Sequence, residues 1–298
     1  MVSHGQQCLE KRSAPTEAEI VDIERLVELC NRHDGLNMRL SRKMLKTRPA
    51  LEICDFLYYQ DDKLVGYLGL ESWGIEKREL HIGVVHPDYR QRGIFRQLLA
   101  VAQAECAARG TKKLILVSES TSGSGTAAAL ALRGRYTFSE HAMELQDLHE
   151  RMAFDDRLSC EVADANDIDA LVKVQARSFN DPEAQVLVMV TRRLQDPECC
   201  FFLARFGEEG LGCREPVGVL RIHTYDDWYN IYAFGVLPEY RGRGYGRQIL
   251  EEAVRFIRKQ SQKPIKLEVD TTNAVAMSLY QSCGFRTETT YNYYVLDL

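Results

Sequence analysis

The chain carries one internal repeat whose two copies lie half a chain length apart. Residues 85–99, VHPDYRQRGIFRQLL, match residues 236–250, VLPEYRGRGYGRQIL. Arg90 aligns with Arg241, an offset of 151 residues in a chain of 298. Solenoid units recur about every 20–50 residues, so a single repeat at this distance indicates two similar domains in tandem.

The secondary structure expected around the two copies follows the same order. A strand-like apolar run precedes each copy, a helix with apolar residues at helical spacing starts within it, and another strand follows. The expected ranges are 63–70, 93–109 and 113–117 in the first half, and 216–223, 244–259 and 265–269 in the second. A strand, loop, helix and strand in succession form a crossover that adds a parallel pair to an otherwise antiparallel sheet.

We therefore expect an α/β (α+β) fold of two tandem domains, each a mixed, mostly antiparallel sheet flanked by helices. The domains are assigned to residues 1–152 and 158–298. Their boundary is set between residues 149 and 159, where a polar stretch precedes a new strand-like run.

The charge balance argues against nucleic acid or an anionic membrane as a partner. Acidic residues outnumber basic ones, 43 to 38, which gives a formal net charge of −5. Both polyanions are bound mainly through an excess of Lys and Arg, and this chain has none.

The cysteines and the N-terminus indicate a cytoplasmic protein. The nine cysteines include no CxxC pair, so they match neither a zinc motif nor a disulfide framework, and we expect reduced thiols and no metal. The first residues, MVSHGQQ, do not form a signal peptide, and no apolar run is long enough to span a membrane.

The segment RGRGYG at 241–246 lies between a strand and a helix in the second copy. Glycines at 242, 244 and 246 would let the backbone approach a pyrophosphate, whose charge suits a helix N-terminus. A tight turn with solvated arginines would use the same residues. The nucleotide-binding alternatives are excluded, because neither the Walker spacing nor the dinucleotide fingerprint is present.

The segment resembles the acyl-coenzyme A loop of the GNAT superfamily of N-acetyltransferases, Q/R-x-x-G-x-G/A, on Arg241, Gly244 and Gly246. A second block at 273–285, NAVAMSLYQSCGF, is similar to the N-x-x-A-x-x-L-Y-x-x-x-G-F helix of that superfamily. The resemblance implies acetyl-CoA as cosubstrate. The residues it assigns to cosubstrate binding are Phe234, Val236, Arg241, Gly242, Arg243, Gly244, Tyr245, Gly246 and Asn273.

The same resemblance implies a mechanism in which an amine attacks the thioester and the Tyr280 hydroxyl protonates the departing thiolate. A phenol with a pKa of about 10 is protonated at neutral pH and can act as this acid. Tyr280 could instead be an ordinary core residue. The general base stays open among Asp226, Asp227, His223, Glu268 and Asp270.

Aromatic side chains gather in the sequence near the expected acceptor strands. They could stack on an amine or form cation–π contacts, or they could be ordinary strand residues. The set comprises Tyr225, Trp228, Tyr229, Tyr232, Tyr291, Tyr293 and Tyr294.

The first half has lost parts of this pattern. Phe95 stands where the loop of the second half has Gly246, and Ala131 lies near the position of Tyr280. We expect a degenerate first domain that completes the acceptor pocket or pairs its sheet with that of the second domain. The sequence leaves open whether this first domain binds acyl-CoA.

The resulting hypothesis is an N-acetyltransferase that transfers acetyl from acetyl-CoA to a primary amine of a small molecule or peptide. The alternative is a non-catalytic acyl-CoA-binding regulatory module, and a scaffold without coenzyme is a weaker third. The sequence leaves the acceptor, the general base and the oligomeric state open.

Overall fold

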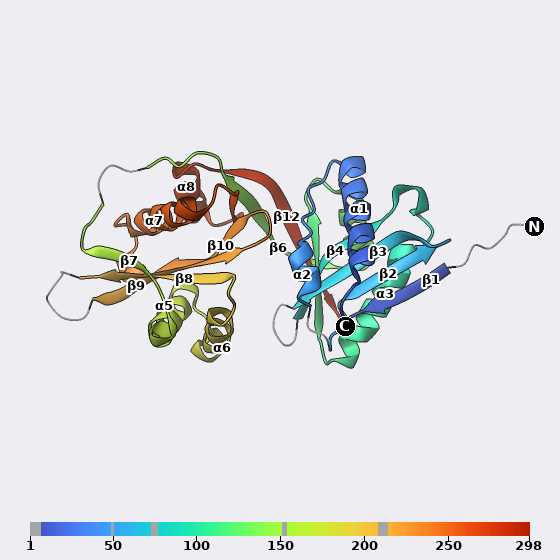
Figure 1. Cartoon of the computed structure of the whole chain (residues 1–298), viewed down its shortest axis with the longest axis horizontal. Coiled ribbons are helices and arrows are strands. Elements are labelled where there is room, and N and C mark those ends of the chain that lie inside the picture. Colours follow the sequence, from blue (N-terminus) through green and yellow to red (C-terminus); the bar gives the residue numbers. More distant parts are fainter. Residues whose placement is uncertain (1–6, 49–50, 73–76, 151–153, 208–213) are drawn as a thin grey trace, which may run out of the picture. The chain divides into compact units, whose positions relative to one another are not determined.

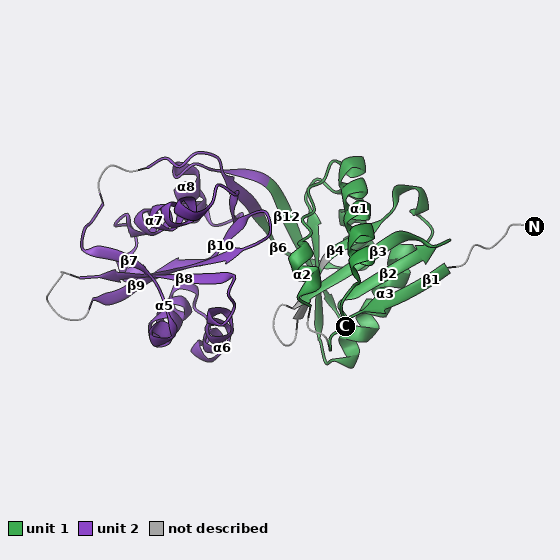
Figure 2. Ribbon diagram, viewed as in Figure 1, with its two compact units in different colours: residues 1–140, 289–298 green, residues 141–288 purple. Residues whose placement is uncertain are grey.

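The computed structural model of the chain describes residues 7–48, 51–72, 77–150, 154–207 and 214–298. The chain forms two compact units (Figure 2). Unit 1 comprises Met1–Glu140 and Thr289–Leu298, and unit 2 comprises His141–Glu288.

In unit 1 the sheet has the strand order β1-β2-β3-β4-β5-β12, in which only β4 and β5 pair in parallel (Figure 1). Helices α1 and α2 cover one face and α3 and α4 the other. The elements are β1 (Gln7–Arg12), α1 (Glu17–Asp34), α2 (Arg42–Lys46), β2 (Asp55–Gln60), β3 (Lys63–Ser72), β4 (Lys77–Val85), α3 (Ile94–Ala108), β5 (Lys113–Glu119), α4 (Gly123–Ala131), the start of β6 (Arg135–Leu145) and the end of β12 (Phe285–Asp297).

In unit 2 the strand order is β6-β11-β10-β9-β8-β7, and β10 and β11 form the parallel pair. Helices α5 and α6 cover one face, and α7 and α8 cover the other (Figure 1). The elements are β7 (Leu158–Val162), α5 (Ile168–Phe179), α6 (Glu183–Leu194), β8 (Cys199–Phe206), β9 (Glu215–Thr224), β10 (Tyr229–Val236), α7 (Tyr245–Gln260), β11 (Ile265–Asp270) and α8 (Ala274–Ser282). The predicted fold class is confirmed in both units.

Each unit is completed by a strand that the other unit shares. Strand β6 runs from unit 1 into unit 2, and β12 runs from unit 2 into unit 1, so both change colour along their length in Figure 2. Within unit 1, β12 pairs with β5 from Tyr291 opposite Glu119 to Asp297 opposite Lys113. Phe138 and Tyr293 stack there with ring centroids 4.3 Å apart.

The division between the units differs from the expected domains 1–152 and 158–298. It falls after residue 140 and again after residue 288, whereas the sequence placed one boundary between residues 149 and 159. Residues 151–153 of that interval lie outside the described residues. Alternation within a strand sets which side chains face the core, but it does not encode which sheet the strand joins.

Helix α7 is held close to the sheet of unit 2. Its buried face includes Ile249, Leu250 and Val254, which pack in the main core of the unit. A Cβ added to Gly218 on β9 would lie 2.5 Å from Ile249 Cδ1, so a larger residue here would force the Ile249 side chain or α7 to shift. Gly218 pairs with Val236 at the end of β10, which fixes the start of α7 beside that strand end.

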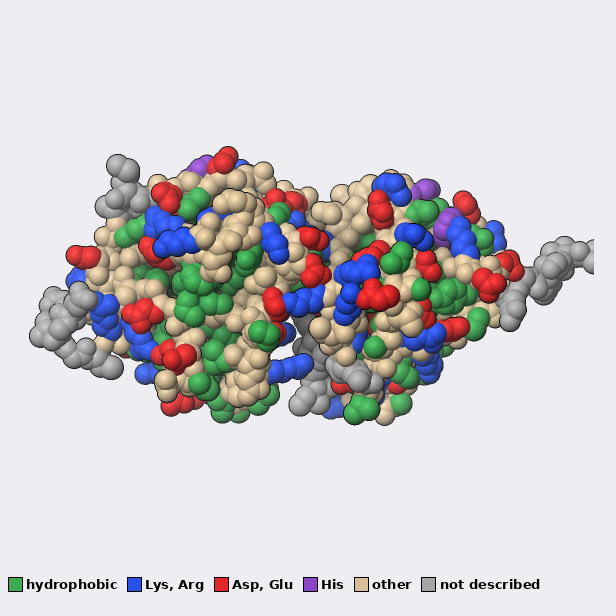
Figure 3. Space-filling model, in the orientation of Figure 1, with side chains coloured by type: hydrophobic (Ala, Val, Ile, Leu, Met, Phe, Trp, Pro, Cys, Tyr) green, Lys and Arg blue, Asp and Glu red, His purple; other side chains and the backbone are tan. Residues whose placement is uncertain are grey.

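The surface agrees with the sequence composition. On the face seen in Figure 3, basic and acidic side chains are intermingled on each unit. Among the described residues, no helix is both long and apolar enough to cross a membrane. The eight described cysteines carry free thiols, and Cys213 lies outside the described residues.

Candidate functional site

The loop between β10 and α7 has a backbone that presents amide groups at a helix end. Gly242 and Gly244 have φ angles of 75° and 87°, in the left-handed region that favours glycine. Gly244 is the N-cap of α7, and no side-chain hydrogen bond caps the helix. The first amide groups of a helix have no partner within it and carry a partial positive charge. This end of α7 is therefore suited to an anion.

The two arginines of the loop brace it through backbone carbonyls. Arg241 donates from Nε to the Val236 carbonyl at 2.8 Å and from Nη2 to the Ser178 carbonyl at 3.0 Å. Arg243 donates to the Glu239 carbonyl at 3.0 Å. Carbonyls do not neutralise a guanidinium, so both positive charges remain beside the helix N-terminus while the side chains hold the loop in shape.

The side chain of Tyr245 lies in the core of unit 2. It is buried, and its hydroxyl donates to Asp155 Oδ2 at 3.0 Å. Hydrogen bonds from Arg157 lower the pKa of Asp155 to about 2, so this carboxylate is an acceptor at neutral pH. Only the backbone N–H of Tyr245 is left to contribute to a site at the loop.

Strands β10 and β11 separate midway along their length. Their parallel pairing runs from Tyr229 opposite Ile265 to Ile231 opposite Leu267. Strand β10 then bulges, and Ala233 takes a φ of 48°, which is rare for a residue with a side chain. Beyond Ile231, no strand in the described part of the chain pairs with the β11-facing edge of β10. Nothing in the sequence around Ala233 signalled this bulge.

Phe234, Val236 and Gly246 come together at this opening. An added Cβ on Gly246 would lie 3.8 Å from Phe234 Cζ and 4.0 Å from Val236 Cγ2. The nearest atom would be Leu279 Cδ2 of α8, at 3.4 Å, which is an ordinary contact. Packing within the protein therefore does not require a glycine at 246.

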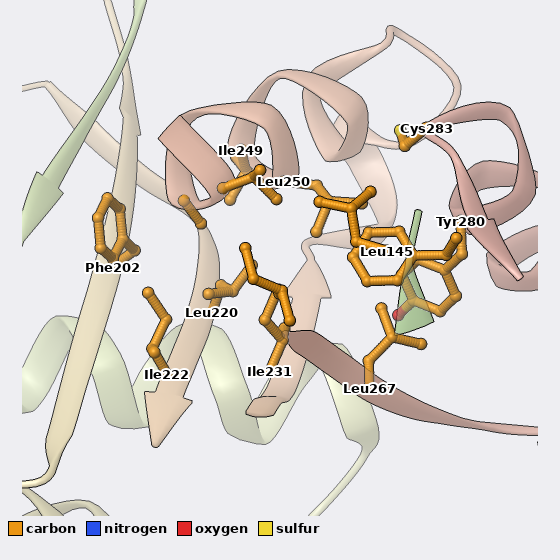
Figure 4. Close-up of a cluster of buried hydrophobic side chains, with 14 of the residues drawn as sticks. Leu145, Phe202, Leu220, Ile222, Ile231, Ile249, Leu250, Leu267, Tyr280 and Cys283 are labelled. Carbon is orange, nitrogen blue, oxygen red and sulfur yellow. The ribbon is translucent and has the colours of Figure 1, made fainter. Parts of the chain in front are cut away.

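Tyr280 is buried on the α7–α8 side of the sheet. Its ring lies 6.3 Å from the Phe234 ring, and it belongs to the cluster that includes Ile231 and Leu267 (Figure 4). Burial raises the pKa of Tyr280 well above its usual value, which keeps the phenol protonated at neutral pH. Asn273 caps α8, because its Oδ1 accepts from the Ala276 amide at 3.1 Å.

A glycine-capped helix start, an opened pair of parallel strands and a buried tyrosine thus occupy one side of unit 2. The sequence profile described as "Acetyltransferase (GNAT) family" matches residues 22–132 and 165–285. The chain belongs to this family. It is a tandem GNAT protein and an acyl-CoA-dependent acetyltransferase.

Relatives named mycothiol acetyltransferase match most of the chain. The protein of that name from Thermomonospora curvata is 28% identical over 279 residues, covering 91% of each chain. The one from Acidothermus cellulolyticus is 28% identical over 259 residues, covering 78% of this chain and 77% of its own.

Solved structures have the same fold. A GCN5-related N-acetyltransferase from Sphaerobacter thermophilus superposes with a TM-score of 0.77 at 19% identity, over 97% of this chain and 95% of its own. A tandem GNAT protein from the clavulanic acid biosynthesis pathway gives 0.74 at 14% identity, over 98% of both chains.

Among the candidate bases of this GNAT protein, Glu268 lies nearest to the strand opening in sequence. It follows Leu267, the last paired residue of β11, and accepts from Asn230 Nδ2 at 2.8 Å. Leu267 packs in the cluster with Tyr280, so strand alternation puts Glu268 on the opposite face of the sheet. Asn230 is 1% exposed and was not singled out from the sequence.

The other candidates are engaged elsewhere or exposed. Asp270 accepts from the amide and hydroxyl of Thr272 at 2.7 and 2.6 Å, which caps a turn. Asp226 and Asp227 are exposed. His223 Nδ1 lies 3.1 Å from the thiol of Cys199.

The predicted aromatic cluster is divided between the units. On the Glu268 side, the hydroxyls of Tyr225 and Tyr232 are 2.9 Å apart, and Tyr225 stacks on Trp228 at 4.6 Å. Burial raises the pKa of Tyr232, and the Glu268 carboxylate raises it further. Tyr229 packs against the core of unit 2. Tyr291, Tyr293 and Tyr294 belong to unit 1, because the end of β12 pairs there.

The first GNAT repeat has the same loop backbone as the second, but Phe95 places an aromatic ring where the second repeat has Gly246. Gln91 and Gly93 have φ angles of 61° and 77°, like Gly242 and Gly244 in the second repeat. The ring of Phe95, however, lies 2.8 Å from where a Cβ on Gly83 would stand. The aromatic ring that β10 supplies at Phe234 in unit 2 is therefore supplied in unit 1 by the first turn of α3.

Proposed function

We propose that this protein transfers the acetyl group of acetyl-CoA to a primary amine of a small molecule, and that its second repeat carries the reaction. The observation that supports this most strongly is that Gly246 and Tyr280 lie beside Phe234 on β10, whose edge toward β11 no described strand pairs with after Ile231. Strands β4 and β5 separate at the matching point of unit 1, after Leu80 and Leu116, so the strand opening alone does not single out the second repeat. The first repeat has the loop but not the space, and Ala131 there offers no phenol.

The cosubstrate would bind along this opening. Its pyrophosphate would accept from the amides of residues 242–246 at the start of α7, within the field of Arg241 and Arg243. The pantetheine arm would pair with the edge of β10 at Phe234 and Val236, beside the start of α8 at Asn273. A glycine in a helix costs up to about 1 kcal/mol relative to alanine, and packing does not explain Gly246, so we attribute it to close approach of the cosubstrate.

The reaction would be direct acyl transfer. The amine attacks the carbonyl carbon of the thioester while the Val236 amide stabilises the developing oxyanion. The carbon–sulfur bond breaks and the Tyr280 hydroxyl gives its proton to the thiolate. Glu268, on the other face of the sheet, accepts the proton lost by the amine, directly or through water. Proton exchange with solvent restores both side chains, and the products are the amide and free CoA.

Two observations bear on the identity of the acceptor: the names of the relatives, and the polar groups on the Glu268 face of the unit 2 sheet. The curated relatives are named for mycothiol, a small molecule, which favours a small-molecule amine over a peptide as the acceptor. The Tyr225, Tyr232 and Glu268 groups would surround such an amine. The acceptor of those relatives is therefore the first compound to screen, followed by amino sugars and polyamines.

The test is Tyr280→Phe, with CoA thiol release measured against a panel of amines and acetyl-CoA affinity measured by calorimetry. Removal of the general acid is expected to lower kcat about 100-fold with an unchanged Kd, because only the hydroxyl is lost. Tyr136→Phe, an exposed tyrosine of unit 1, is the matched control and should keep full activity. Binding without thiol release for any amine would instead favour a non-catalytic acyl-CoA-binding module.

A further inference from the structure

Three side chains that bind metals in other proteins converge at one end of the unit 2 sheet. Cys199 begins β8 and pairs directly with His223 on β9, while Asp196 lies in the turn between α6 and β8. Cys199 Sγ is 3.1 Å from His223 Nδ1 and 3.6 Å from Asp196 Oδ2. The three ligand atoms all lie within 4.8 Å of one another.

The distances from Cys199 Sγ to His223 Nδ1 and to Asp196 Oδ2 are close to those between ligand atoms around a tetrahedral zinc ion. Bonds of about 2.3 Å to sulfur and about 2.0–2.1 Å to nitrogen or oxygen place neighbouring ligand atoms about 3.5 Å apart. Small side-chain movements would therefore suffice to enclose an ion. All three residues are partly exposed, so an ion can enter from solvent and a water can take the fourth position.

The surroundings orient the three groups. Asp196 Oδ1 accepts from the Glu198 amide at 3.0 Å, which turns Oδ2 toward the thiol. Arg221 Nη1 lies 3.8 Å from Cys199 Sγ, where it can stabilise a thiolate. Arg193 pairs with Asp196 Oδ2 at 3.5 Å, but its side chain is 41% exposed and can move into solvent.

We propose that Asp196, Cys199 and His223 bind one Zn²⁺ ion, with water as the fourth ligand. The Cys199 thiol loses its proton to solvent, and the thiolate, the His223 Nδ1 lone pair and the Asp196 carboxylate bind the ion. One thiolate and one carboxylate balance its charge. Thiolate and imidazole ligands select zinc over magnesium or calcium. The ion links the α6–β8 turn to β9. Its ligand His223 is the β9 residue that pairs with Asn230 of β10.

This site is independent of the acetyl-transfer proposal. The sequence did not reveal it, because the ligands lie on a turn and two strands, with spacings that match no zinc motif. Its test therefore uses metal binding rather than activity.

The experiment is calorimetric titration of ZnCl₂ into chelator-treated full-length protein, with Co²⁺ absorption as a second probe of thiolate ligation. The wild type is expected to bind one equivalent with micromolar or tighter affinity. Cys199→Ser and His223→Gln should each weaken binding at least about 100-fold, beyond the 10- to 100-fold typical of partners outside the ligand set. Cys200→Ser is the matched control, because Cys200 packs on the opposite face of the sheet and should leave binding unchanged.

Circular dichroism of each variant checks that it is folded, and Asp196→Asn replaces any variant that is not. Zinc should raise the Tm of the wild type and of Cys200→Ser, but not that of Cys199→Ser. No saturable binding in the micromolar range, or binding and cobalt–thiolate absorption that survive Cys199→Ser, would overturn the proposal.

Discussion

Two glycines of unit 2 should respond in opposite ways to the same substitution. A Cβ at Gly246 would stand 3.4 Å from its nearest neighbour, whereas a Cβ at Gly218 would overlap Ile249 Cδ1 at 2.5 Å. Gly246→Ala should raise the free energy of unfolding by up to about 1 kcal/mol, because alanine is the better helix former. Gly218→Ala should lower it by about 1–3 kcal/mol, since the fully buried Ile249 side chain or α7 itself must shift to admit the methyl group.

For acetyl-CoA affinity, Gly246→Ala should be the more damaging of the two substitutions. A methyl group at 246 enters the space that we assign to the cosubstrate, so Gly246→Ala should raise the Kd about 10-fold, equivalent to about 1.4 kcal/mol. Gly246→Trp should abolish binding in the second repeat. Gly218 faces the core, so Gly218→Ala should leave the Kd nearly unchanged in protein that remains folded.

Thermal unfolding of the ligand-free protein and calorimetry with acetyl-CoA measure both effects. A change of 1 kcal/mol shifts Tm by about 2–4 °C in a domain of this size. The reasoning fails if Gly246→Ala is stabilised with an unchanged Kd, because the glycine would then have no ligand to accommodate. One equivalent that survives Gly246→Trp would put the cosubstrate elsewhere, and two equivalents in the wild type would show that the first repeat also binds.

Three further perturbations test other parts of the structure. Burial raises the pKa of Tyr280, so kcat should not fall with loss of this acid between pH 7 and about 10, and a falling limb in that range of the pH–rate profile would contradict its role. The same group stabilises the fold below its unfolded pKa of about 10, and denaturant titrations of wild type and Tyr280→Phe should show that this contribution declines above that pH. Glu251 is 0% exposed and pairs with Arg247 and Arg255, so Glu251→Ala should cost about 3 kcal/mol by chemical denaturation; a loss under 1 kcal/mol would mean that the pairs contribute little. Deletion of residues 289–298 should unfold unit 1, and a Tm equal to that of the full chain would show that β12 is dispensable.

Local chemistry in the sequence is sufficient to predict the backbone of the loop before α7 and the cap of α8. The glycines at 242 and 244 require left-handed angles that few other residues adopt, and Asn273 is a good helix cap, so these positions could be assigned without coordinates. The opening of β10 coincides with a bulge at Ala233, an ordinary strand residue whose φ of 48° has no signal in the sequence. The exchange of β6 and β12 was also invisible, because side-chain alternation is the same whichever sheet a strand joins.

The two repeats together separate what the loop motif does for folding from what it does for binding. Arg90 donates from Nε to the Val85 carbonyl at 3.0 Å, as Arg241 does to Val236 at 2.8 Å, although Phe95 stands in the first repeat where the second has Gly246. An arginine contact that is present in both repeats serves to hold the turn. In the proposed site the anion is bound by the backbone that the arginine shapes, and the two repeats differ in having Gly83 and Phe95 in the first and Phe234 and Gly246 in the second. We therefore propose that acyl-CoA binding by a repeat depends on which element supplies the aromatic ring, the strand or the first turn of the helix.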